Sequence, residues 1–196
     1  MITSEVDYRF YLEADRIALA RGTKRPSFED DIWKFEILLR KVEYRKNCKH
    51  SSLSRLYLKS LYLRFHLLGR KLGFTIPPNT FGPGLAIAHR GTIVVHFNAR
   101  VGENCRVHVC TDIGTEARYG DKAPRIGNNV YLGPGAKIFG DITIGDDSAI
   151  AANAVVNRSF PEPHQTIGGI PAQKISGKGS EGLLIRATDI LRNKKS

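Results

Sequence analysis

The sequence predicts a mainly β protein with α-helices: a parallel β-helix of hexapeptide repeats that follows a helical N-terminal domain. An aliphatic residue returns every six positions between residues 101 and 160, glycine often follows it directly, and a mostly small residue stands four positions after it. A helix would need a period of about 3.6 and an ordinary sheet a period of about 2. The aliphatic row is Val101, Val107, Ile113, Ile126, Leu132, Ile138, Ile144, Ile150 and Val156.

Each hexad predicts one short strand and one turn, with two side chains directed inward. The small inward residues are Cys105, Thr111, Val130, Ala136, Ile142, Ser148 and Ala154. We expect successive coils to bury each other's aliphatic row, and the glycines to ease the turn backbone. Cys105 is therefore expected to fill the core rather than act as a nucleophile or ligand.

The 196 residues divide into three parts. Residues 1–75 are expected to be helical, because apolar residues follow helical spacing in 28–44 and 53–68 and Gly73 suits a helix end. Residues 76–175 form the repeat domain, in which the polar segment 115–125 breaks the register and predicts a loop on one face. Residues 176–196 form a tail, with a short helix expected at 183–191 and frayed residues from Arg192 onward.

The composition of the chain indicates the cellular compartment in which it works. The sequence has no apolar stretch long enough to cross a membrane, and its first residues lack a basic region followed by an apolar run. Three cysteines without framework spacing agree with a reducing environment. We therefore expect a cytoplasmic protein.

The net charge of +11 is concentrated outside the repeats. Residues 1–75 hold 16 Lys and Arg against 9 Asp and Glu, whereas residues 76–175 hold 9 against 8. A basic domain can attract an anionic membrane surface, a phosphorylated substrate or nucleic acid, although a solvated helix face is the commoner explanation. We expect no nucleic-acid partner, and we keep peripheral contact with the inner face of the membrane as an option. The apolar stripe of residues 53–68 is expected to pack against neighbouring helices or subunits, and the alternative is an amphipathic helix that lies on a membrane.

Three segments of the repeat domain carry a family pattern. They are HRGTIVVHFNARVGENCRVHVCTDIG at residues 89–114, and YLGPGAKIFGDITIG and IGGIPAQKI further along the chain. In these segments the chain resembles the hexapeptide acyltransferases, and within them the serine acetyltransferase-like branch. The resemblance implies a left-handed β-helix, acetyl-coenzyme A (acetyl-CoA) as donor, transfer to a hydroxyl, and a homotrimer with active sites between adjacent solenoids. No metal is expected.

The resemblance maps the catalytic base onto His89. A hydroxyl attacks a thioester slowly unless a base removes its proton, and a neutral imidazole has a suitable pKa. His96, His108 and Arg90 are candidates for the acceptor site, and His108 is expected to point outward because it follows an aliphatic core position. The partner that orients His89 is left open among Glu103, Asp112, Glu116 and a backbone carbonyl.

The resemblance also maps a coenzyme groove. The matching positions are Pro134, Gly135, Ala151, Ala152 and the segment from Gly169 to Lys174. Small residues there let a pantetheine arm lie close to backbone amides and carbonyls. The family usually has a basic residue directly after Pro-Ala; here Gln173 stands at that place, and Lys174 is the expected phosphate contact.

Departures from the branch bear on the acceptor. Serine acetyltransferases have an Asp directly before the catalytic His, a second Asp further upstream, and a His in the polar loop. This chain has Ala88, Phe74 and Ala123 there. The ammonium group of an amino acid needs a carboxylate partner. The expected acceptor is therefore a sugar hydroxyl in surface-polysaccharide biosynthesis, and IPPNTFGPGLAIAHRGTIVV resembles the versions found in such enzymes.

Three alternatives stay open. The first is a serine O-acetyltransferase of cysteine biosynthesis with a rearranged acceptor site. The second is a metal-dependent hydratase on the same scaffold, in which His89, His96 and His108 would converge on zinc across a subunit boundary. The third is a non-catalytic scaffold whose helical domain binds a partner or a membrane.

Overall fold

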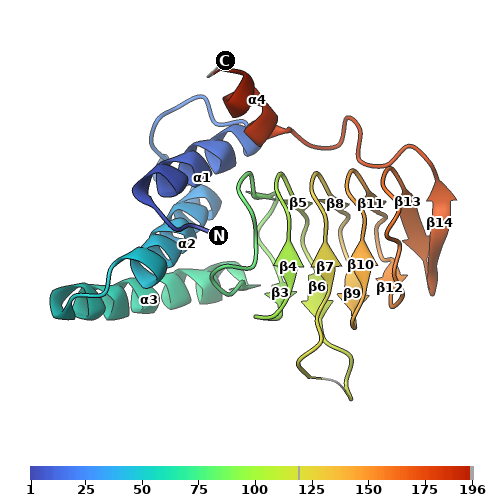
Figure 1. Cartoon of the computed structure of the whole chain (residues 1–196), viewed down its shortest axis with the longest axis horizontal. Coiled ribbons are helices and arrows are strands. Elements are labelled where there is room, and N and C mark those ends of the chain that lie inside the picture. Colours follow the sequence, from blue (N-terminus) through green and yellow to red (C-terminus); the bar gives the residue numbers. More distant parts are fainter. Residues whose placement is uncertain (119, 195–196) are drawn as a thin grey trace.

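The computed structural model describes residues 1–118 and 120–194 and has two parts that lie side by side (Figure 1). Helices α1 (Glu5–Ala18), α2 (Asp31–Cys48) and α3 (Ser52–Leu72) form the N-terminal part, and a stack of short strands forms the other. A short helix, α4 (Ala187–Asn193), lies near the C-terminal end. The predicted β-helix of hexapeptide repeats, preceded by a helical domain, is confirmed.

The strands form three sheets, one on each face of the solenoid, which we call A, B and C. Sheet A contains β1 (Phe74–Thr75), β3 (Ile93–Val95), β6 (Thr111–Gly114), β9 (Lys137–Phe139) and β12 (Val155–Val156). Sheet B contains β4 (Arg100–Val101), β7 (Arg125–Ile126) and β10 (Thr143–Ile144). Sheet C contains β2 (Ala86–Ile87), β5 (Arg106–Val107), β8 (Tyr131–Leu132), β11 (Ala149–Ile150), β13 (Thr166–Gly169) and β14 (Ala172–Ser176).

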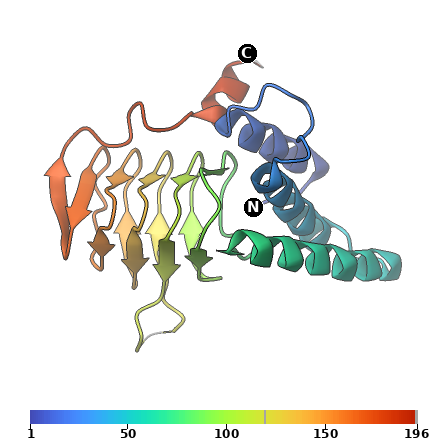
Figure 2. The same cartoon turned by 180° about the vertical axis from the view of Figure 1, so that it is seen from behind.

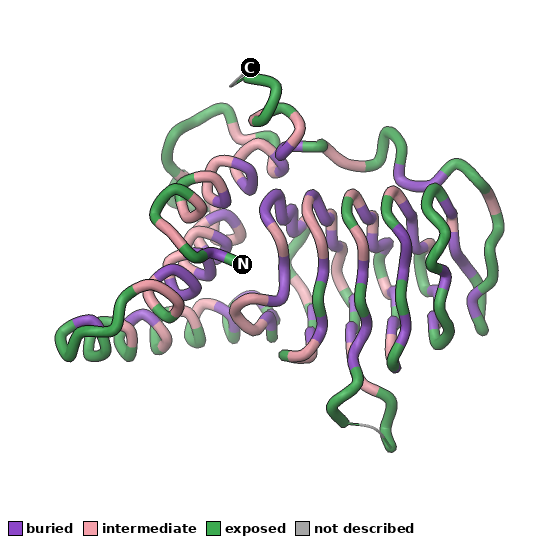
Figure 3. Tube along the Cα trace, viewed as in Figure 1, coloured by how far each residue is buried: buried purple, intermediate pink, exposed green. Residues whose placement is uncertain are grey.

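Neighbouring strands in each sheet are parallel and one coil apart, except that β14 turns back antiparallel to β13. Every residue of the aliphatic row is buried, and so is every residue of the small row. Cys105 is buried among them, and burial raises the pKa of its thiol, so it is core filler as expected. Figure 3 shows this buried row on successive coils.

The glycines after the aliphatic row have a different role from the one expected. They do not supply the left-handed turn residues, which are mainly Asn and Asp at positive φ: Asn104, Asn129, Asp147 and Asn153. A Cβ on Gly102 would lie 2.7 Å from the carbonyl oxygen of Gly127 on the next coil. Glycine is therefore required there because adjacent coils approach closely, not because the turn needs its flexibility.

The helical domain caps the open end of the solenoid through buried charges. The fully buried Arg40 guanidinium is 2.7 Å from the Asp15 carboxylate and 3.0 Å from that of Glu43. These side chains also bind backbone groups of the first coil, which has no preceding coil to pair with. Arg40 donates to the carbonyls of Phe81 and Gly82. Asp15 accepts from the amides of Gly84 and Leu85. Glu43 accepts from the amide of Asn79, and Glu36 accepts from that of Ile87.

Local signals explain where the helices begin and end. Ser4 and Ser51 are N-caps whose side chains accept from the amides of Asp7 and Ser54. Gly73 ends α3 in the left-handed conformation, as predicted. The first strand follows at once, because β1 begins at Phe74, slightly ahead of the expected boundary.

The C-terminal tail returns along the solenoid to the helical domain (Figures 1 and 2). The Asn104 amide binds Asn129 at 2.8 Å and the Thr188 hydroxyl at 2.8 Å, which attaches α4 to the first coils. Ala187 packs against Ala14 and Ala18 of α1. The tail helix begins later than expected, and Arg192 is not frayed: it lies within α4 and pairs with Glu103 at 2.8 Å. Residues 195–196 of the expected frayed end lie outside the described residues.

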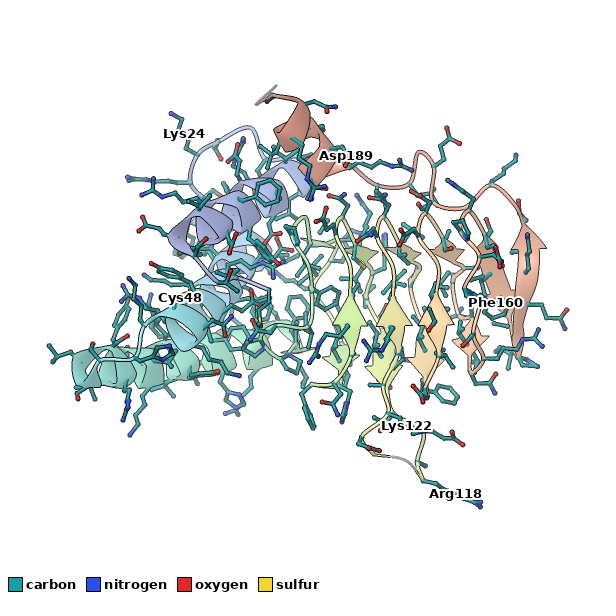
Figure 4. The ribbon with its side chains drawn as sticks, in the orientation of Figure 1. Lys24, Cys48, Arg118, Lys122, Phe160 and Asp189 are labelled. Carbon is teal, nitrogen blue, oxygen red and sulfur yellow. The ribbon has the colours of Figure 1, made fainter. Side chains whose placement is uncertain are left out.

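The polar interruption forms a loop that leaves the solenoid after β6 and returns at β7 (Figure 1). Asn98 donates to the carbonyl of Asp121 at 2.8 Å, and Lys122 pairs with Asp141 at 3.2 Å, so the base of the loop is attached to two coils. Arg118 lies at its far end and points away from the solenoid (Figure 4). Tyr119 lies outside the described residues.

Candidate active site

One edge of the solenoid, formed by the turns that follow the strands of sheet C, collects most of the predicted site residues. Backbone hydrogen bonds place equivalent positions one coil apart: Ala88 donates to Val107, Gly133 to Ile150, and Ala151 to Ile167, at 2.8 to 3.0 Å. Stacked strands are about 4.8 Å apart. His89, Pro134, Ala152 and Gly169 therefore follow one line along this edge, which we call the C edge. His108 lies on it too, because its amide donates to Leu132 at 3.1 Å.

His89 lies at the first coil of the C edge, directly after β2. Its side chain is exposed, and its ring centroid lies 5.9 Å from that of His108 on the next coil. The backbone before it is fixed by the helical domain, because Glu36 accepts from the amide of Ile87 at 3.0 Å. His89 is therefore an accessible imidazole on a rigid support.

His108 is half-buried and stands at the centre of a polar cluster. Its ring lies 5.1 Å from that of Tyr131, and the Arg106 Nε donates to its Nε2 at 3.4 Å. Burial lowers the pKa of His108, and the charge of Arg106 and the proximity of His89 lower it further. His108 is consequently a neutral hydrogen-bonding group near pH 7, and the Arg106 contact places the proton of the neutral ring on Nδ1.

A small cavity of about 130 Å³ adjoins this cluster, between the helical domain and the first coils. It is lined by Arg106 of β5, by Ala88 next to His89, and by Arg21 of the segment between α1 and α2. Arg21 is already paired with Asp30 at 2.6 Å, so Arg106 is the guanidinium beside His108 that can meet an anionic group. Larger cavities exist, including one of about 550 Å³ over sheet B, but that one is on another face from the two histidines.

The remaining part of the C edge offers a track without large side chains. Gly133 and Gly168 are buried beneath it, where coils approach closely: a Cβ on Gly133 would lie 2.8 Å from the amide nitrogen of Ala152, and one on Gly168 would lie 3.0 Å from the Cβ of Ala151. From His89 to Gly169 the track spans four coil steps, or about 19 Å. Lys174 is exposed on β14, paired in register with Ile167 of β13. The exposed positions along the track are Pro134, Ala152 and Gly169, and the cation of Lys174 lies near its far end.

Two predicted acceptor residues do not join this cluster. His96 follows β3 of sheet A, so it lies at a different corner, where its Nδ1 accepts from the Asn98 amide at 3.2 Å and its ring packs on Phe97. Arg90 turns toward α2: its Nη2 is 3.6 Å from Asp31 and 3.3 Å from the carbonyl of Glu29. Arg90 therefore ties the His89 turn to the helical domain.

The acidic candidates for orienting His89 also lie elsewhere in this chain. Glu103 follows β4 of sheet B and pairs with Arg192. Asp112 lies in β6 of sheet A, and Glu116 lies in the loop after it. Among the described residues, no group of three His, Cys, Asp or Glu side chains is placed to hold a metal ion. The three histidines of the hydratase alternative are divided between two corners of the solenoid.

Sequence reasoning missed Arg106 and Tyr131. Both occupy outward positions of sheet C, directly before an aliphatic core residue, and they are cross-strand partners. Since His108 follows one core position and Arg106 precedes it, the hexad register itself would have placed both side chains on the same outer surface. The hexad register therefore indicated their position, but side chains at outward positions are usually solvated, so their position alone did not identify them as site residues.

Comparison with known proteins gives the family. Residues 123–158 match the family described as "Bacterial transferase hexapeptide (six repeats)". A serine acetyltransferase from Mycobacterium tuberculosis is 36% identical over 100 residues, which are 50% of this chain and 43% of that protein. One from Helicobacter pylori is 32% identical over 115 residues, 54% of this chain and 67% of that protein. The chain thus spans less than half of the first relative's length.

A solved structure extends the similarity into the helical domain. The crystal structure of a serine acetyltransferase in complex with coenzyme A from Brucella abortus strain S19 has a TM-score of 0.69 and 27% identity. The match covers 89% of this chain and 70% of that chain.

These relatives correct the expected acceptor. The prediction of a sugar in surface-polysaccharide biosynthesis is wrong, because the similar proteins carry the name serine acetyltransferase. The sugar prediction rested on Ala88 and Phe74, which stand where serine acetyltransferases have carboxylates. Phe74 is buried with its ring 5.1 Å from that of Phe35, so it serves the junction with α2, and Ala88 lines the small cavity. These two positions reflect local packing and do not outweigh the similarity over 100 residues. The chain belongs to the hexapeptide-repeat transferase family, in which its named relatives are serine acetyltransferases.

Proposed function

We propose that this protein is an acetyl-CoA-dependent O-acetyltransferase whose acceptor hydroxyl is that of serine. The observation that carries the proposal is the C edge, where the exposed His89 stands at one end of a track whose exposed positions are Pro134, Ala152 and Gly169. The names of the relatives support serine as the acceptor.

In the proposed reaction His89 acts as general base. It takes the proton from the serine hydroxyl while the oxygen attacks the carbonyl carbon of the thioester. The new C–O bond forms, the C–S bond breaks, and the proton held by His89 is returned to the departing coenzyme A thiolate. The products are O-acetylserine and coenzyme A, so neither an oxidant nor a covalent enzyme intermediate is required.

The neighbours of His89 position the acceptor in this proposal. Arg106 binds the carboxylate of serine, since guanidinium and carboxylate form a geometrically matched pair. His108, neutral near pH 7, lies between Arg106 and His89 and fixes the direction of the guanidinium. Because positions 74 and 88 offer no carboxylate for the ammonium group, we expect recognition to depend mainly on the acceptor's carboxylate.

The coenzyme and the assembly complete the proposal. Pro134, Gly135, Ala151, Ala152 and Gly169 line the pantetheine arm, and Lys174 contacts a phosphate. The chain is proposed to work in the cytoplasm as a homotrimer, with a neighbouring solenoid closing over the exposed His89. His96, which lies at another corner, would then reach an acceptor only in the neighbouring subunit's site.

The test follows thiol release from acetyl-CoA with free serine as acceptor. The wild-type protein is expected to turn serine over, and His89→Ala is expected to lower kcat by about 10²- to 10⁴-fold while still binding coenzyme A. His66→Ala, on the exposed side of α3, is the matched control and should retain normal turnover. Near-normal activity of a trimeric, coenzyme-binding His89→Ala variant would show that another group is the base.

A second arm tests the acceptor. Arg106→Gln is expected to raise the KM for serine by about tenfold or more without changing the KM for acetyl-CoA. Arg125→Gln, an outward arginine on sheet B, serves as control. Competition by 3-hydroxypropionate, which lacks the ammonium group, should approach that of serine, whereas serinol, which lacks the carboxylate, should compete poorly. The reverse order would overturn the assignment of Arg106.

A further inference from the structure

Helix α3 carries a stripe of exposed leucines that the rest of the chain leaves uncovered. Leu53 is 83% exposed, Leu56 69%, Leu63 60% and Leu67 53%. The sequence pattern predicted that this stripe would pack against a neighbouring element, but within the chain it does not. Figures 1 and 2 show α3 extending beyond the other helices, at the end of the molecule away from the later coils.

The stripe is on the side of α3 opposite to its packed face. At about 100° per residue, the four leucines fall within an arc of about 80°, centred about 155° from the buried face. The buried residues of the described helix are Ser54, Leu61, Gly69 and Leu72. The helix therefore has two apolar faces, one toward α2 and the solenoid and one toward the surroundings.

Cations flank the leucine stripe on both sides. Arg55, Lys59 and Arg70 lie along one border, and Arg64 lies along the other, next to Lys71, which is paired with Asp31 of α2 at 2.9 Å. The sequence contains no Asp or Glu from residue 44 to residue 102, so α3 carries no acidic side chain. An amphipathic helix of this kind presents leucines at the centre and positive charges at both rims.

A groove between α2 and α3 extends this surface. It has a volume of about 650 Å³, with an apolar floor that includes Ile37, Leu38 and Leu61. Lys34, Lys41 and Arg64 contribute to its lining, and Leu67 of the stripe borders it. The groove could receive part of an acyl chain while the cations meet a phosphate group.

We propose that α3 lies flat in the interface of an anionic lipid bilayer. Leu53, Leu56, Leu63 and Leu67 enter the acyl region, and the flanking lysines and arginines contact the headgroup phosphates. The helix is 21 residues long, or about 31 Å, and among the described residues no helix is long and apolar enough to cross a membrane. The contact is therefore peripheral.

Charge favours a bilayer over a second copy of α3 as the occupant of the stripe. A second copy of α3 would place two helices without any acidic residue against each other, so that their lysines and arginines would repel. Anionic headgroups neutralise these cations and leave the leucines in contact with hydrocarbon. The proposal is independent of the acceptor of the acetyltransferase, because none of its residues lies on the C edge.

Vesicle sedimentation tests the proposal with the full-length protein. Vesicles of phosphatidylcholine containing about one third phosphatidylglycerol should bind the protein, and pure phosphatidylcholine should not. The double variant Leu56→Gln/Leu63→Gln is expected to weaken binding by roughly tenfold or more. Val6→Gln, at a residue that is 70% exposed on α1, is the matched control. Circular dichroism and thermal unfolding, measured in parallel without vesicles, verify that the variants are folded.

Insertion is measured separately from adsorption. Leu63→Trp should show a blue-shifted emission and quenching by brominated acyl chains in the anionic vesicles, whereas Val6→Trp should not. The natural Trp33 is buried and supplies a constant background. Binding that ignores the leucine substitutions, a lack of quenching, or a change of oligomeric state without vesicle binding would each overturn the proposal, the last in favour of a second copy.

Discussion

The solenoid and the helical domain are stabilised by different interactions. In the solenoid, aliphatic side chains are stacked coil upon coil, and the inward positions carry no charge. At the junction with the helical domain, Asp15, Glu36, Arg40 and Glu43 are all buried and bind the backbone of the first coil. The comparison shows that each coil finds backbone hydrogen-bond partners in the coils next to it, except at the end of the stack. There, side chains of another domain replace the missing coil.

The largest loss of unfolding free energy is expected from removing a charge at the junction between the helical domain and the first coil. Arg40→Met should lower the free energy of unfolding by about 3–5 kcal/mol, because Asp15 and Glu43 then remain buried without their cation. Thermal and urea unfolding measure the change. Arg9→Met, which removes an exposed pair with Glu5, should cost about 0.5 kcal/mol or less. Equal stability of the two variants would mean that the junction charges contribute little.

A core truncation in the solenoid is expected to have a slightly smaller effect. Ile138→Ala removes a fully buried side chain between coils and should cost about 3 kcal/mol, since the stacked coils cannot close the cavity. Val94→Ala, at an outward and partly exposed position of β3, is the control and should cost less than about 1 kcal/mol. A loss at Ile138 no larger than that at Val94 would contradict close packing of the row.

The smallest expected effect is a change in how the free energy of unfolding depends on pH, and it arises at the junction and not in the solenoid. Burial raises the pKa of Glu36 well above its usual range, and nearby Asp15 raises it further. A carboxyl group with a raised folded-state pKa stabilises the fold fully below its unfolded pKa, and this stability is lost as pH rises toward the folded value. As pH rises above the ordinary pKa of a glutamate, Glu36→Gln should therefore lose less unfolding free energy than the wild type.

The glutamine can still accept from the Ile87 amide, so the variant keeps the capping bond while losing the ionisation. Ile138→Ala is the companion measurement, because it should shift the whole stability curve without changing its dependence on pH. Parallel pH curves for wild type and Glu36→Gln would show that Glu36 does not titrate differently in the folded state.

The repeat itself could be predicted from the sequence because its signal is local and redundant. Every residue of the aliphatic row is buried as expected, and Gly73 ends α3 as expected. The contact between His89 and His108 also follows from register, since they are about one full coil apart. His96 comes only about one hexad after His89, so it lies on the next corner, which the residue type alone could not reveal.

The junction could not be predicted, because charged residues are usually exposed and its pairs are distant in the sequence. Arg40 meets Asp15 only after α1 and α2 pack together. The role of the glycines was misjudged for a related reason: a close approach between coils depends on the three-dimensional stack, whereas a turn preference is visible locally. The register does place Arg106 and His108 on one outer surface, but their hydrogen bond depends on side-chain conformations that the pattern does not specify.

The returning C-terminal tail has a consequence for how the chain unfolds. A linear stack of repeats can lose its terminal coils one at a time, since each coil contacts only its neighbours. Here Ser180 binds Asp147 near the far coils, Thr188 binds Asn104 near the first, and Ala187 packs on α1. The tail thus links distant coils to the same helix, so peeling of the last coil also releases contacts at the opposite end. We therefore expect the whole chain to unfold cooperatively, although each coil contacts only its neighbours.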